Sequence, residues 1–272
     1  MTGPPLMGRL LARDRWIVSG ALLLGVAGSA AYILVSGGSG MSSLEMTAQT
    51  GPLGALIGGT PDMVSAASWT PAYALVIFGM WWLMMVAMMV PSAAPTILLY
   101  GALHREGGVW GMVEFLFGYL AIWAGFSLLA TAVQGFLAAG GLISMMYWNL
   151  ATPYLGAAVL LGAGLYQLTP VKRACLVHCR GPVAALTQHR RAGRLAAFRM
   201  GMWHGKFCLG CCWGLMALLF VGGVMNLWWI LGIALFVAVE KLMPFGDRLT
   251  RPLAFLLIAG GGAMFLRATG LV

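Results

Sequence analysis

Seven long apolar runs constrain this chain more than any other feature of its sequence. A helix needs roughly 20 apolar residues to cross a bilayer, and the runs lie at about 16–35, 71–100, 110–138, 153–168, 201–221, 225–239 and 253–266. Charged residues make up only 8% of the chain, whereas soluble domains carry roughly 25%. The sequence therefore predicts an all-α, polytopic membrane helix bundle of about seven transmembrane helices. The expected partner of such a bundle is the lipid bilayer.

The positions of Lys and Arg predict how this bundle is oriented. With the N-terminus in the cytoplasm, fifteen of the sixteen basic residues fall on the inner side and only Arg267 lies outside. Because cytoplasmic loops are enriched in Lys and Arg, we expect the N-terminus on the cytoplasmic side and the C-terminus on the outer side. Residues 1–272 then form a single integral domain, with a cytoplasmic N-terminus at 1–15, a periplasmic loop at 36–70 and a basic cytoplasmic segment at 170–199.

Several functional classes are excluded by missing motifs. The sequence contains no phosphate-binding loop and no dinucleotide fingerprint, which excludes an ATP-driven pump made of this chain alone. It also lacks a nucleophile elbow and a zinc-protease helix, so a non-enzymatic role is favoured. No basic stripe is interleaved with aromatic residues on a soluble module, and we therefore expect no nucleic-acid binding.

The soft metal ligands are concentrated in one segment, because all five cysteines and three of the four histidines lie within 175–212. On a helix, residues three and four positions apart share a face, and two half-sites have this spacing. The predicted metal ligands are Cys175, His178 and Cys179 in the first half-site and His204, Cys208, Cys211 and Cys212 in the second.

Thiolate and imidazole ligands select copper(I) or zinc over hard cations. We expect a copper ion at this site, with zinc as the alternative. A second interpretation is a structural clip of zinc or an iron–sulfur cluster. A third is that the cysteines are simply small buried residues.

Methionines extend the soft-ligand pattern into the apolar run at 71–100. Met84, Met85, Met88 and Met89 lie at helical spacing there, and thioethers bind copper(I) without losing a proton. These residues are candidate ligands of a metal relay, although methionine also fills gaps in protein cores. Two prolines in the same run, Pro91 and Pro95, permit a kink beside such a pathway. Elsewhere, Glu240 and Lys241 are expected to form an ion pair within or at the edge of the membrane.

Three motifs together resemble those of a bacterial family of uncharacterised proteins described as predicted metal-binding integral membrane proteins. They are the run MWWLMMVAMMVP at 80–91, the segment KxxCLxHCRxP at 172–182, and GxxCLGCCW at 205–213 followed by GVMNL at 223–227. The resemblance covers most of the chain from about residue 70 onward. It implies a helical inner-membrane protein with a metal site, but no particular metal or substrate.

The sequence supports three functional hypotheses. In the first, the protein handles copper as a transporter or membrane chaperone that serves a metallochaperone or a cuproenzyme. In the second, it is a membrane thiol redox protein that uses Cys208 and Cys211, which have dithiol spacing. In the third, it is a non-enzymatic subunit of a membrane complex that is held together by a zinc clip.

Overall fold

The computed structural model describes residues 20, 27–29, 31, 69–104, 108–143, 150, 152–181, 195–243 and 245–271. Within these ranges the protein is helical, and the only β pairing is an isolated bridge between Ile143 and Leu150. This confirms the predicted all-α class. The helices in chain order are α4 (Pro71–Leu103), α5 (Gly108–Ala139), α6 (Pro153–Gln167), α7 (Pro170–Arg180), α9 (Ala196–Ala217), α10 (Leu219–Gly222), α11 (Leu227–Leu242) and α12 (Gly246–Ala268).

Four helical stretches are long and apolar enough to cross a membrane: α4, α5, α9 continued by α10 (Ala196–Gly222), and α12 from Arg248 onward. Helices α6 and α7 supply a fifth if they form one span that is bent by 63°. Helix α11 has only 16 residues, or about 24 Å, against a hydrocarbon core of about 30 Å. The apolar run at 16–35 lies outside the described residues except at positions 20, 27–29 and 31, so seven spans and the N-in orientation stay predictions.

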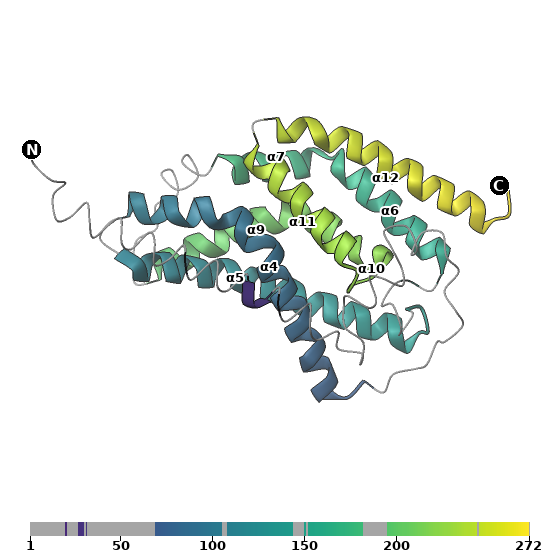
Figure 1. Ribbon diagram of the computed structural model, residues 1–272, viewed down its shortest axis with the longest axis horizontal. Helices are drawn as coiled ribbons and strands as arrows, with labels where there is room; N and C mark the ends of the chain where they lie inside the picture. Colours follow the sequence, from purple (N-terminus) through teal and green to yellow (C-terminus); the bar gives the residue numbers. More distant parts are fainter. Residues whose placement is uncertain are drawn as a thin grey trace, which may run out of the picture.

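The helices form two packed groups that are joined by α11. Figure 1 shows α4, α5 and α9 together on one side, while α6 and α12 run antiparallel along the other. Helix α11 lies between the groups and contacts both α4 and α12. Helix α7 follows the bend after α6 and packs on α9.

Glycines allow α5 and α9 to approach each other closely. A methyl group at Gly201 would lie 1.9 Å from the carbonyl oxygen of Phe115, and one at Gly118 would lie 2.0 Å from that of Phe198. Gly201 and Gly205 are four residues apart, which is the small-xxx-small spacing of membrane helix interfaces. Because these glycines have no side chain, the backbones themselves make the contact.

Helix α4 carries Pro91 and Pro95 in its interior, and Figure 1 shows the helix bending along its length. Each proline removes one backbone hydrogen bond and crowds the preceding turn. The hydroxyl of Ser92 donates to the carbonyl of Met89 at 2.8 Å, so a side chain adds a hydrogen bond at this turn. The bend therefore falls in the same part of α4 as the predicted methionine ligands.

The close contact at Gly201 can be tested by adding one methyl group. We expect Gly201→Ala to lower the free energy of unfolding by about 2–3 kcal/mol, because the helix backbones must separate. The measurement is thermal unfolding of the purified protein in detergent. The matched control is Gly79→Ala in α4, where no heavy atom lies within 4 Å of the added carbon. Equal effects of the two substitutions would contradict the proposed packing.

Candidate metal centre

The two predicted half-sites are carried by two helices that pack on each other, α7 and α9. Helix α7 begins at Pro170, and the preceding Thr169 caps it by accepting a hydrogen bond from the amide of Lys172 at 3.3 Å. Its residues are helical as far as Arg180, so Cys175 and Cys179 lie on one face, as expected. The second half-site lies within α9, and the half-sites meet in the core of the bundle.

Sulfur atoms are paired at the meeting point. The Cys211 Sγ lies 3.9 Å from the Cys179 Sγ, and the Cys212 Sγ lies 3.9 Å from the Met89 Sδ. All four side chains are buried and none of the five cysteines is in a disulfide. We call Cys179, Cys208, Cys211, Cys212 and Met89 the sulfur cluster. It draws on α4, α7 and α9.

Cys175 lies beside this cluster, against the backbone of α9. A methyl group at Gly210 would come within 2.7 Å of the Cys175 Sγ, so the glycine makes room for the sulfur. Cys175 is partly exposed, unlike the other four cysteines. It is therefore the most accessible thiol of the first half-site.

Cys208 has two polar neighbours that the sequence did not reveal as site residues. Its Sγ lies 3.0 Å from the hydroxyl of Tyr119 in α5 and accepts a hydrogen bond from the Nζ of Lys241 at 2.9 Å. The Tyr119 hydroxyl also lies 3.3 Å from the carbonyl oxygen of Met89. A tyrosine inside an apolar run and a lysine at the end of another carry no local motif, so only the packing brings them to the cluster.

The predicted ion pair between Glu240 and Lys241 is wrong. Glu240 pairs instead with Lys172 of α7 at 2.6 Å and accepts a hydrogen bond from Thr250 of α12, also at 2.6 Å. Consecutive residues on a helix point about 100° apart, so Lys241 faces Cys208 while Glu240 faces α7 and α12. Gln167 accepts a further hydrogen bond from Lys172.

Both predicted histidine ligands pack among aromatic rings. The His204 ring lies 6.0 Å, between centroids, from each of Phe115 and Tyr119. The His178 ring stacks on Phe207 at 4.0 Å and meets Trp203 at 4.4 Å. The sequence expectation that they are metal ligands stays a prediction.

The predicted methionine ligands are all buried in the core. Met89 belongs to the sulfur cluster through its contact with Cys212, whereas Met84, Met85 and Met88 lie earlier along α4. The sequence pattern thus located buried thioethers, and the structure brings one of them within contact distance of a cysteine.

The donor atoms of the site meet the geometric needs of a metal ion only in part. Among the residues that the structure describes, no three His, Cys, Asp or Glu side chains are arranged to hold a metal ion. The sulfur pairs come closer to the spacing that a metal needs. Two sulfurs bound to one tetrahedral metal, with bonds of about 2.3 Å, lie about 3.8 Å apart. The two sulfurs of each pair are 3.9 Å apart. The arrangement can therefore offer pairs of soft ligands.

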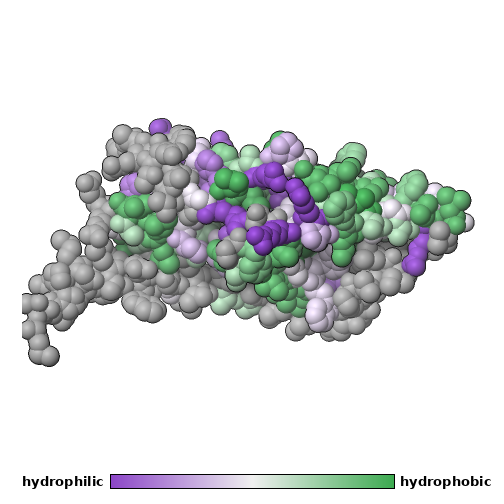
Figure 2. Space-filling view, turned by 90° about the horizontal axis from the view of Figure 1, so that it is seen from above, coloured by the Kyte–Doolittle hydropathy of each residue, from purple (hydrophilic) through white to green (hydrophobic). Residues whose placement is uncertain are grey.

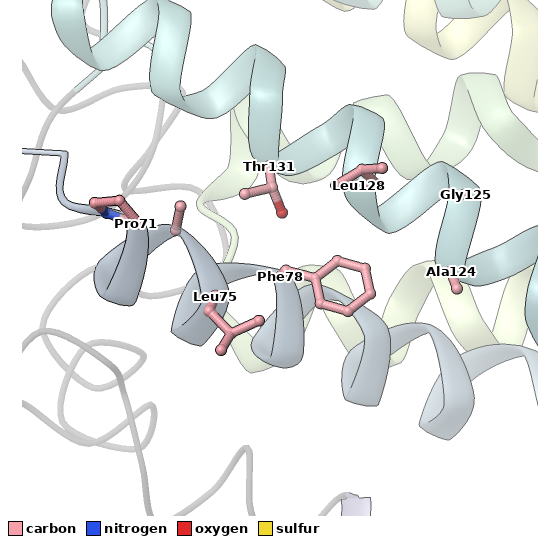
Figure 3. A pocket seen from close by; sticks show the side chains of 8 residues that line it. Pro71, Leu75, Phe78, Ala124, Gly125, Leu128 and Thr131 are labelled. Atoms are coloured by element: carbon pink, nitrogen blue, oxygen red, sulfur yellow. The ribbon is translucent and has the colours of Figure 1, made fainter.

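A pocket elsewhere in the bundle, shown in Figure 3, offers no comparable chemistry. It lies between α4 and α5, has a volume of about 480 Å³, and is lined mainly by apolar side chains such as Leu75, Phe78 and Leu128. Its one hydroxyl, on Thr131, donates to the carbonyl of Ser127 at 2.8 Å. The sulfur cluster is therefore the stronger candidate site.

The fold and the cluster define an all-α bundle of apolar helices that encloses paired thiol and thioether sulfurs. A family model described as PpoB2, copper chaperone, matches residues 78–264, and the chain belongs to this family. The match contains every predicted metal ligand as well as Tyr119 and Lys241, and it supports the resemblance to a metal-related family. No curated protein and no solved structure matches the chain.

The meeting of the half-sites predicts a specific cross-link. In a variant that retains only Cys179 and Cys211, mild oxidation should form an intramolecular disulfide, because the two sulfurs already lie 3.9 Å apart and need to close to about 2.05 Å. Peptide mass mapping after thiol blocking measures it. The control lacks Cys179 as well and has a single thiol. A two-cysteine variant that stays fully reduced under these conditions would contradict the observed packing of α7 on α9.

Proposed function

We propose that this protein is a copper chaperone of the bacterial inner membrane that carries copper(I) in its sulfur cluster. The observation that carries the proposal is the pairing of Cys179 with Cys211 and of Cys212 with Met89, each at 3.9 Å, in a buried core. Soft sulfur ligands favour copper(I), and the family is named for copper chaperones. Cys175, His178 and His204 adjoin this centre as further candidate ligands.

The membrane location is part of the proposal. The long apolar helices need lipid around them, because leaving so many large exposed hydrophobic side chains in water is costly. The excess of basic residues on one predicted side supports insertion with the half-site of α7 on the cytoplasmic side. Copper would therefore be received from the cytoplasm, and its acceptor would be a cuproenzyme or a subunit of a membrane complex.

Charge balance explains a buried lysine beside the thiols. Two thiolates and one copper(I) ion together carry a charge of −1, which is expensive in a membrane interior. The Lys241 ammonium, 2.9 Å from the Cys208 Sγ, supplies the compensating positive charge. Tyr119 contacts the same sulfur and the carbonyl of Met89, so it holds α5, α9 and α4 together at the point where the ion binds.

The methionines of α4 provide a route out of the cluster. Met89 contacts Cys212, and Met85 lies one turn earlier, about 6 Å along the helix axis. Met84 and Met88 form the neighbouring stripe. Exchange between ligands of similar softness would move copper(I) along α4 without nucleotide hydrolysis, and this route would serve a transporter equally well.

The first test is the copper content of the purified protein. We expect about one copper(I) per chain after loading, and loss of that copper in the double variant Cys179→Ser, Cys211→Ser, because serine is a harder ligand than thiolate. Met89→Leu should weaken binding roughly tenfold, or about 1.4 kcal/mol. Met112→Leu is the matched control, since Met112 is buried in α5 away from the predicted ligands.

The same elemental analysis separates the other hypotheses. Unchanged copper content in the folded double variant would rule out the cluster as the copper site. Stoichiometric zinc that does not exchange would favour a structural clip. A metal-free protein that forms mixed disulfides with a thiol partner would favour redox exchange.

Lys241 gives a second, independent test. Lys241→Met keeps the length of the side chain but removes its charge, and we expect copper(I) affinity to fall by about tenfold to a hundredfold. Competition with a chromogenic copper(I) chelator measures the affinity. Lys206→Met, on an exposed position of the same α9 that carries the thiols, should leave it unchanged. Equal affinities in the two variants would remove Lys241 from the mechanism.

A further inference from the structure

Helix α7 has a second face that the sulfur cluster does not use. Cys175 and Cys179 face α9, whereas Arg173 and Arg180 project from the other side of the helix and, together with Lys172, line a pocket. Figure 2 views the molecule from above and shows hydrophilic side chains gathered over the region of α7 and the start of α12. This polar surface is set among otherwise apolar helices.

The pocket lies where α6, α7 and α12 meet. Its volume is about 720 Å³, within the range of small-molecule sites. The three helices each contribute to its lining, and the polar side chains there are those of Gln167, Thr169, Lys172, Arg173, Arg180, Thr250 and Arg251. None of the described residues that line it is acidic.

The basic side chains of the pocket differ in how they are held and in how exposed they are. Lys172 is buried, and its ammonium is paired with Glu240 at 2.6 Å, so it forms a neutralised floor. Arg180 is oriented by a hydrogen bond from its Nη2 to the carbonyl of Met243 at 2.8 Å. Arg173 and Arg251 are exposed at the rim. Three guanidinium groups from two helices therefore surround a space whose floor is already neutral.

We propose that this pocket binds a phosphate group, carried either by an anionic phospholipid or by a soluble molecule. Guanidinium groups match phosphate oxygens with paired hydrogen bonds, and basic pockets between membrane helices hold anionic headgroups. The pocket lies at the end of α6 and the start of α12, which is the end of the bundle where the sequence places its positive charge.

A bound phosphate would connect two helices. Arg173 and Arg180 belong to α7 and Arg251 belongs to α12, so one anion between them would tie the helices together. Since Cys175 and Cys179 lie on the other face of α7, the same anion would stabilise the position of that half-site. The phosphate site would thus affect the sulfur cluster without contacting the copper ion.

The test measures thermal unfolding of the full-length protein with two probes. The first is inorganic phosphate in detergent, compared with chloride at matched ionic strength. The second is a nanodisc of phosphatidylglycerol, compared with one of phosphatidylcholine. We expect a gain of about 2–5 °C in the midpoint with at least one probe. A gain with phosphate identifies a soluble ligand, and a gain with phosphatidylglycerol alone identifies a lipid.

The double variant Arg173→Gln, Arg251→Gln should lose this gain, while the double variant Arg199→Gln, Arg267→Gln should keep it, because those arginines lie elsewhere on the surface. If the first variant does not fold, Arg173→Gln alone, with the retained phospholipid counted by native mass spectrometry, replaces it. Equal gains in wild type and in the Arg173 and Arg251 variant, or no gain with either probe, would overturn the proposal.

Discussion

Close contact between helix backbones is the constraint on which the site depends. Gly201 and Gly118 let α9 lie directly on α5, and Gly210 leaves space for the sulfur of Cys175. Small residues let two helix backbones come into van der Waals contact, as they do at the interfaces of membrane helices. The thiols of α9 are therefore enclosed because the helix that carries them has glycines on its packed faces.

Helix α11 contributes one charged residue to each of two polar clusters. Lys241 contacts the sulfur of Cys208, and its neighbour Glu240 is paired with Lys172 and held by Thr250. A buried charge needs a partner, and here each of the two adjacent charges has one on a different helix. This short helix thus fixes the spacing between the sulfur cluster and the basic pocket.

The sequence predicted the all-α class and the long apolar helices, because its apolar runs have the length of helices that can span a bilayer. The helical spacing of Cys208, Cys211 and Cys212 also predicted their common helix. What the sequence could not supply was tertiary contact. The distance from Cys179 to Cys211, the approach of Tyr119 and the partner of Lys241 all depend on how helices far apart in the chain pack, and the adjacent charges at 240 and 241 suggested a pair that helical geometry prevents.

The two half-sites are held in the fold in different ways, because one lies on a long helix and the other follows the bend between α6 and α7. Helix α9 is packed along its length, so its three thiols form a fixed wall. Helix α7 has 11 residues, is joined to α6 through a 63° bend, and carries Cys175 and Cys179 in its second half. Any movement of α7 that separated Cys179 from Cys211 would also break the contacts of Lys172 with Glu240 and of Arg180 with the carbonyl of Met243. The half-site on α7 is therefore held in place by polar contacts at both ends of its helix.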